Sequence, residues 1–80
     1  MEKVIKQELA NGRIQYTFNG NVIRTSKKNF NYALVAISRQ HENPTPFIVG
    51  LGNNPKSLKS SWSHIYAHWC DLYTIDTENK

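Results

Sequence analysis

Apolar and polar residues alternate over residues 13–18, the pattern of an antiparallel strand with one buried face and one solvent-facing side. Asn-Gly pairs at 11–12 and 19–20 separate this run from its neighbours. Both residues tolerate the positive φ angles of a type I′ turn, so Asn-Gly between strand-like runs is a strong hairpin signal. The pattern predicts a three-stranded antiparallel meander that ends at Ser26.

Two further apolar runs predict strands in the second half of the chain. Residues 30–37 are apolar on both faces toward the end of the run, which predicts a central strand, and 47–51 predicts its short partner. The intervening loop contains Pro44 and Pro46, which prevent regular pairing. The segment 71–76 predicts a closing strand.

An amphipathic helix is predicted over residues 55–69. Asn54 is a suitable N-cap, and Pro55 suits the first helical position because its missing N–H would have no partner there. Apolar side chains then recur at helical spacing and form one stripe. The stripe consists of Leu58, Trp62, Ile65, Tyr66 and Trp69.

These elements predict an α+β fold: a twisted antiparallel β-sheet with one late amphipathic α-helix packed on one face. Eighty residues suit a single domain over 1–80, with residues 1–2 and 77–80 frayed. The predicted core combines strand and helix positions. It contains Tyr16, Phe18, Leu34, Val35, Ile48, Leu58, Trp62, Ile65 and Trp69.

Composition narrows the cellular setting. The lone Cys70 excludes an internal disulfide framework and favours a reducing compartment. The first residues include acids and no apolar run typical of a signal peptide, and no stretch approaches the roughly 18 apolar residues of a membrane span. We therefore expect a cytoplasmic protein.

No constellation of residues predicts catalysis. His64 and His68 have the i, i+4 spacing of a two-histidine metal site, but the general-base glutamate of a zinc hydrolase helix is missing between them. Cys70 follows the predicted helix, where the negative end of the dipole disfavours a thiolate, so we expect a buried apolar role. Asp71 and Asp76 are five apart in a strand and so point to opposite faces. We expect a protein that is not an enzyme and uses neither metal nor cofactor.

The charge distribution is the feature of the sequence that bears most directly on function. The net charge is +4, and between residues 9 and 70 seven bases accompany the single acid Glu42. Such a concentration favours an anionic partner, although it could equally serve solubility alone. The candidate partner- or anion-binding residues are Arg24, Lys27, Lys28, Arg39, Asn54, Lys56 and Lys59.

Two segments are the main candidates for binding an anionic partner. The glycine-containing segment 50–56 precedes a helix N-terminus, where free N–H groups favour a phosphate, although it lacks the P-loop pattern and also fits an ordinary capped loop. The segment 24–32 interleaves bases with Phe30 and Tyr32, which are predicted on one strand face as aromatic contact candidates. Single-stranded nucleic acid is bound by such surfaces, unless both rings face the core.

The segment 22–35, VIRTSKKNFNYALV, resembles small phage-encoded accessory and anti-defence proteins, in which a strand ending in Arg-Thr-Ser leads through a basic turn into an aromatic-rich strand. The resemblance implies a non-catalytic inhibitor, in the host cytoplasm, that binds and blocks a bacterial defence or nucleic-acid-processing complex. That partner would be a protein or ribonucleoprotein. The alternatives are a single-stranded DNA- or RNA-binding module and a protein that sequesters a small phosphorylated ligand such as a nucleotide. Abundant aromatic residues also predict a homo-oligomer.

Overall fold

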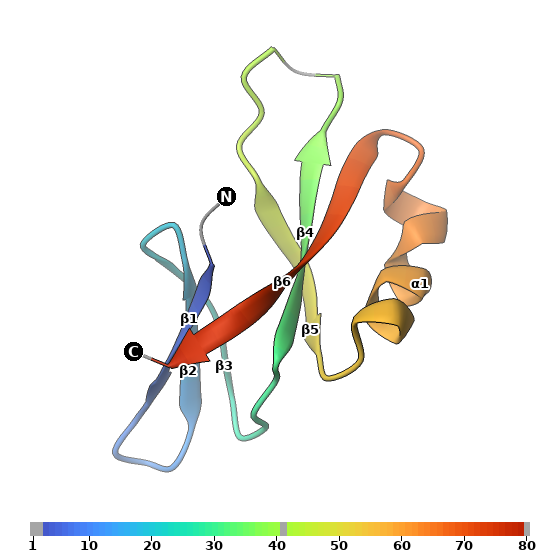
Figure 1. The fold of residues 1–80 in the computed structure, drawn as a ribbon. Coiled ribbons are helices and arrows are strands. Elements are labelled where there is room, and N and C mark those ends of the chain that lie inside the picture. The colour runs from blue at the N-terminus through green and yellow to red at the C-terminus, as the bar shows by residue number, and fades with distance from the viewer. Residues whose placement is uncertain (1–2, 41, 80) are drawn as a thin grey trace.

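The computed structural model describes residues 3–40 and 42–79. In these residues the chain forms six strands and one helix, drawn in Figure 1. The elements are β1 (Val4–Glu8), β2 (Ile14–Phe18), β3 (Asn21–Ser26), β4 (Tyr32–Ser38), β5 (Phe47–Gly52), α1 (Pro55–Tyr66) and β6 (Cys70–Asn79).

The strands form a sheet in the order β3-β2-β1-β6-β4-β5, with α1 packed against the β4, β5 and β6 part. This confirms the α+β fold with a late helix. The prediction of a wholly antiparallel sheet is wrong, because β1 pairs with β6 in parallel from Val4 opposite Thr77. The reason is the length of β6, whose ten residues pair first with β4 and then with β1.

The end of the chain differs from its prediction for the same reason. Residues 77–79 belong to β6 and pair with β1, so they are ordered by the sheet and are not frayed. Residues 1–2 and 80, for which fraying was also predicted, lie outside the described residues.

The predicted meander is confirmed as β1, β2 and β3, but its two turns differ. Asn19 and Gly20 have φ angles of 52° and 80°, so both are left-handed as a type I′ turn requires. In the first turn Gly12 is left-handed, and its N–H donates to the Leu9 carbonyl at 3.1 Å. The Leu9 N–H donates to the Arg13 carbonyl at 2.7 Å, which closes a three-residue loop. The type I′ prediction is therefore wrong for this turn, because the loop has one residue more.

One core cluster lies on the face of the sheet opposite α1. Strands β1 and β2 supply side chains to the same cluster as β4 and β5, so the first half of the chain curls over the second half. The buried members are Val4, Tyr16, Phe18, Ala33, Val35 and Leu51.

A second cluster lies under α1. Leu58 is the buried residue of the described helix, and Trp62 and Tyr66 are half-buried beside it. Cys70 is buried here, which confirms its apolar role. The strands contribute Leu34, Ala36 and Leu72.

The predicted helix and part of the predicted core are wrong at the C-terminal end of α1. The helix ends at Tyr66 instead of residue 69, so Trp69 has left the helical stripe and is 44% exposed. Ile65 is 41% exposed, because the helix covers the sheet only along its Leu58 side. Ile48 is half-buried, as is Trp62, although both were predicted in the core.

Candidate anion-binding surface

The turn between β3 and β4, residues 27–31, is held in place by a buried tyrosine. Tyr16 on β2 has no exposed surface, and its hydroxyl donates a hydrogen bond to the Lys28 carbonyl at 2.6 Å. The same hydroxyl accepts a hydrogen bond from the Phe30 N–H at 2.8 Å. One core side chain therefore binds the backbone on both sides of Asn29.

Two other strands reach the same turn. Lys6 on β1 is 6% exposed, and its ammonium group donates to Asn29 Oδ1 at 2.8 Å. On β6, the Thr77 hydroxyl donates to the Phe30 carbonyl at 2.7 Å, and the Thr77 N–H donates to the Asn31 carbonyl at 3.0 Å. An unsatisfied buried polar group costs about 1–3 kcal/mol, so these bonds resist any other arrangement of the turn.

The turn also contacts the loop that leads into α1. The Asn31 N–H donates to Asn53 Oδ1 at 2.9 Å, and Figure 1 shows the β3–β4 and β5–α1 connections at the same end of the sheet. Lys56 is exposed in the first turn of α1. It therefore lies at the same end as the exposed Lys27 and Lys28.

Two arginines extend this surface. Ile14 pairs with Ser26 in the β2–β3 register, so Arg13 lies beside the turn that follows β3. The guanidinium of Arg24 lies 5.5 Å from the centre of the Phe30 ring. We call these five exposed bases the basic end: Arg13, Arg24, Lys27, Lys28 and Lys56.

The basic end is not neutralised by ion pairs within the described residues. The two pairs found there join Lys3 to Glu78 at 2.8 Å and Arg39 to Asp71 at 3.1 Å. The hydrogen bond to Glu78 raises the pKa of Lys3 above its ordinary value of 10.5. The five bases of the basic end therefore form no ion pair with the described residues.

Arg39 has a structural role and does not join the basic end, although it was predicted as an anion-binding residue. Its guanidinium donates to the Ala67 carbonyl at 2.6 Å and to the Cys70 carbonyl at 3.1 Å, and it also pairs with Asp71. These contacts connect the end of α1 to β6. Lys59 lies beside Arg39, lining a shallow hollow on the flank of the helix.

The two aromatic contact candidates lie on opposite faces of the sheet, so the prediction of a shared face is wrong. Phe30 precedes β4, is half-buried, and packs against the ring of Tyr16 with 5.9 Å between ring centres. Tyr32 is half-buried in the cluster under α1. The two rings therefore form no common platform on which bases could stack.

The glycine-containing segment before α1 is explained by packing. A Cβ atom added at Gly50 would lie 2.9 Å from Trp62 Nε1, so glycine at this position lets the indole pack closely against β5. The Asn54 side chain accepts a hydrogen bond from the Ser57 N–H at 3.1 Å, which confirms it as the N-cap. Asn54 and Gly50 thus both serve the helix–sheet contact.

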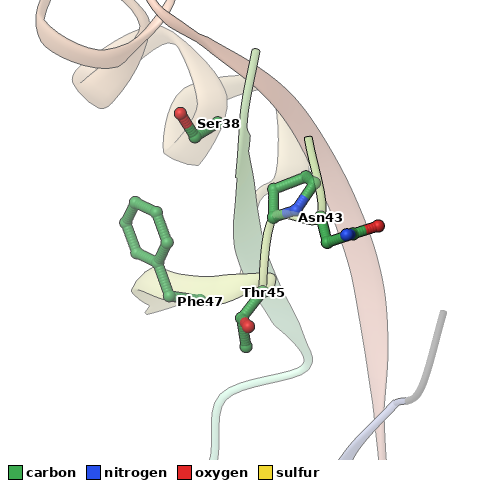
Figure 2. Close-up of a pocket in the computed structure, with 5 residues that line it drawn as sticks. Ser38, Asn43, Thr45 and Phe47 are labelled. Atoms are coloured by element: carbon green, nitrogen blue, oxygen red, sulfur yellow. The ribbon is translucent and has the colours of Figure 1, made fainter. Parts of the chain in front are cut away.

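The hollow at the other end of β4 is chemically different. Figure 2 shows Ser38, Asn43, Thr45 and Phe47 around this space of about 340 Å³, which Pro44 also lines. No charged side chain is among these lining residues. This hollow has no feature that would favour an anion.

Residues 3–40 and 42–79 also include two histidines and the helix that bear on metal binding and on membrane insertion. Within these ranges no group of three or more His, Cys, Asp or Glu side chains is placed to hold a metal ion. His64 and His68 are both exposed. No helix in the same ranges has the length and hydropathy of a membrane span.

Sequence reasoning missed Arg13 as a member of the basic end. The signal was the two-residue Asn19-Gly20 turn, which places the start of β2 opposite the end of β3; the bulge at Ile23 then shifts the register by one residue. Extending that register by one residue brings Arg13 toward Lys27.

No protein-family model, curated protein or solved structure matches this chain. The fold and the geometry of the basic end are therefore the features that bear on function. Together they define a small α+β domain with an ordered basic surface at one end of its sheet.

Proposed function

We propose that this protein is a non-catalytic binding domain that docks its basic end onto an acidic protein surface. The observation that supports it most is the fixed turn carrying Lys27 and Lys28, whose backbone is bonded to the buried Tyr16. A surface that is already ordered loses little conformational entropy on binding, which strengthens association. The resemblance of residues 22–35 to phage anti-defence proteins favours inhibition of a bacterial protein or ribonucleoprotein complex as the biological role.

An acidic protein is a better partner than free single-stranded nucleic acid. Nucleic-acid binding of that kind combines backbone neutralisation with base stacking, and Phe30 and Tyr32 are half-buried in separate clusters. Acids also lie near this end: Glu8 closes β1, and Asp76 pairs with Tyr32 in the β4–β6 register. They lower the net positive charge at this end, which weakens binding to a phosphate backbone.

A phosphorylated small molecule at residues 50–57 is less favoured for a different reason. Asn54 already caps the Ser57 N–H, and the Leu58 N–H donates to the Asn54 carbonyl. The Gly50 backbone faces Trp62. The Asn54 side chain and the Ser57 N–H, two groups that could otherwise help to hold a phosphate, therefore already have partners in the fold.

Affinity capture from a nuclease-treated bacterial lysate tests the proposal, with two variants of equal charge change. Lys28→Glu alters the basic end, and Lys59→Glu alters an exposed helical lysine outside it. We expect a protein partner that survives nuclease treatment, is lost with Lys28→Glu and is retained with Lys59→Glu.

Three results would contradict the proposal. Recovery of nucleic acid alone, with binding that falls steeply as salt rises, would favour the single-stranded binder. A nucleotide released on denaturation would favour sequestration of a phosphorylated ligand. Equal losses for Lys28→Glu and Lys59→Glu would show that general charge, and not the basic end, determines binding.

A further inference from the structure

The two end strands of the sheet, β3 and β5, face each other across a gap. A cavity of about 250 Å³ is lined from both strands, by Ile23, Arg24, Ile48, Val49, Gly50 and Leu51. A second cavity of about 340 Å³ shares Ile23 and Ile48 with the first and also takes its lining from both strands. We call the two cavities together the β3–β5 groove.

The edges that border the groove have unpaired backbone. Within the described residues β3 pairs with β2 alone and β5 with β4 alone, because they are the first and last strands in the sheet order. Each edge also has a bulge. Ile23 is the extra residue on β3, and Val49 is the extra residue on β5.

The bulges limit what such an edge can bind. A bulge bends its strand and interrupts a long flat ladder, so these edges resist continuous sheet formation. Free N–H and C=O groups on either side of Ile23 and Val49 can still pair with a short extended segment. The groove therefore suits a few residues of strand.

The residues that line the groove indicate which side chains a bound extended segment would have. Ile23 and Ile48 are half-buried and pack against the core cluster, which gives the groove an apolar floor. Arg24 is exposed, lines the first of the two cavities, and is the charged side chain among the residues that line the groove. No acid is among these lining residues.

We propose that the β3–β5 groove binds a short extended peptide segment in which apolar and acidic residues alternate. Successive side chains of a strand point to opposite sides, so the apolar ones would contact Ile23 and Ile48 while the acidic ones reach Arg24. A bond between the guanidinium and a carboxylate is charge-assisted and directional. The inference rests on the proposed function and gives the acidic partner a specific form.

The test uses the full ¹⁵N-labelled chain and the peptide acetyl-Val-Glu-Val-Glu-Val-amide, followed by NMR. We expect saturable shifts of the amides of residues 22–24 and 47–51. Arg24→Gln should weaken binding roughly tenfold, as for loss of a charge-assisted hydrogen bond, while Lys59→Gln leaves it unchanged. The peptide acetyl-Val-Gln-Val-Gln-Val-amide should show the same weakening on the wild-type protein, which tests the acid without altering the fold.

The outcomes separate this inference from the proposed function. Shifts confined to residues 27–29 would overturn the groove and leave the basic end as the docking surface. Absence of any shift with this peptide, when hexaglutamate still shifts residues 27–29, would overturn the groove alone. Absence of shifts with both ligands would count against the groove and the basic end together.

Discussion

The two faces of the sheet are stabilised by different kinds of contact. On the face opposite α1, the apolar cluster includes buried polar groups, since Tyr16 and Lys6 bind the β3–β4 turn from inside the protein. Under α1 the described contacts are mainly apolar, centred on Leu58, and Trp69 is left exposed beyond the end of the helix. Apolar contacts are non-directional, whereas hydrogen bonds fix positions. The face opposite α1, which contains Tyr16, therefore determines the position of the β3–β4 turn (residues 27–31). The face under α1 contributes stability.

The largest effect is expected for a substitution under α1, which should lower the free energy of unfolding without altering the β3–β4 turn. Leu58→Ala should reduce the free energy of unfolding by about 2–5 kcal/mol, because it removes the buried anchor of α1. Urea denaturation measures this loss. Below the transition, the amide chemical shifts of residues 27–31 should stay as in the wild type. Large shifts there would mean that the two faces are not independent.

The second-largest effect is expected on the other face of the sheet, where a substitution should alter the β3–β4 turn itself. Tyr16→Phe keeps the ring but removes the hydroxyl, so the Lys28 carbonyl and the Phe30 N–H lose a partner. We expect a loss of about 1–3 kcal/mol in the free energy of unfolding. Amide hydrogen exchange should accelerate at Phe30 in particular. Unchanged protection of that amide would contradict the role given to the hydroxyl.

A matched pair of glycine substitutions probes how closely α1 approaches the sheet. At Gly50 a Cβ would lie 2.9 Å from Trp62 Nε1, so Gly50→Ala should destabilise the protein by about 1 kcal/mol as the indole shifts. At Gly52 the nearest atom, Leu58 Cδ1, is 3.5 Å away, an ordinary contact. Gly52→Ala should be neutral or slightly stabilising, because it lowers the entropy of the unfolded chain. Equal thermal midpoints for the two variants would contradict this account of the helix contact.

The smallest effect concerns the ion pair of Lys3 and Glu78, which lies outside both core clusters. Its hydrogen bond raises the pKa of Lys3 above 10.5, so the pair stabilises the fold below that pH and is lost as pH rises through the raised pKa. The stability difference between wild type and Glu78→Gln should therefore be constant near neutral pH and vanish under strongly alkaline conditions. A difference that grows above pH 10.5 would contradict this sign.

Local patterns predicted most of the fold. Alternation gave β2, the Asn-Gly pairs marked two hairpin turns, and Asn54-Pro55 located the start of α1. The parallel pairing of β1 with β6 depends on residues more than seventy positions apart, and no local pattern encodes it. The exposure of Trp69 was missed because helical periodicity does not show where the helix ends.

The candidate site was predictable in composition but not in arrangement. The sequence contains Lys27 and Lys28 next to each other, and their exposure at a turn follows from charge alone. The bond from Tyr16 to that turn requires the curl of the first half over the second. Arg39 was assigned to the site because its charge is visible in the sequence, whereas its carbonyl partners near the end of α1 are not.

We propose that Tyr16 fixes the β3–β4 turn (residues 27–31) in the conformation that an acidic partner binds, and Tyr16→Phe tests this proposal without changing any charge. The measurement is the dissociation constant for hexaglutamate, read from the amide shifts of residues 27–29 in folded wild-type and variant protein. We predict roughly threefold to tenfold weaker binding by the variant, since it must order the turn on binding. Equal dissociation constants for the two proteins would show that charge alone is sufficient and would contradict the claim.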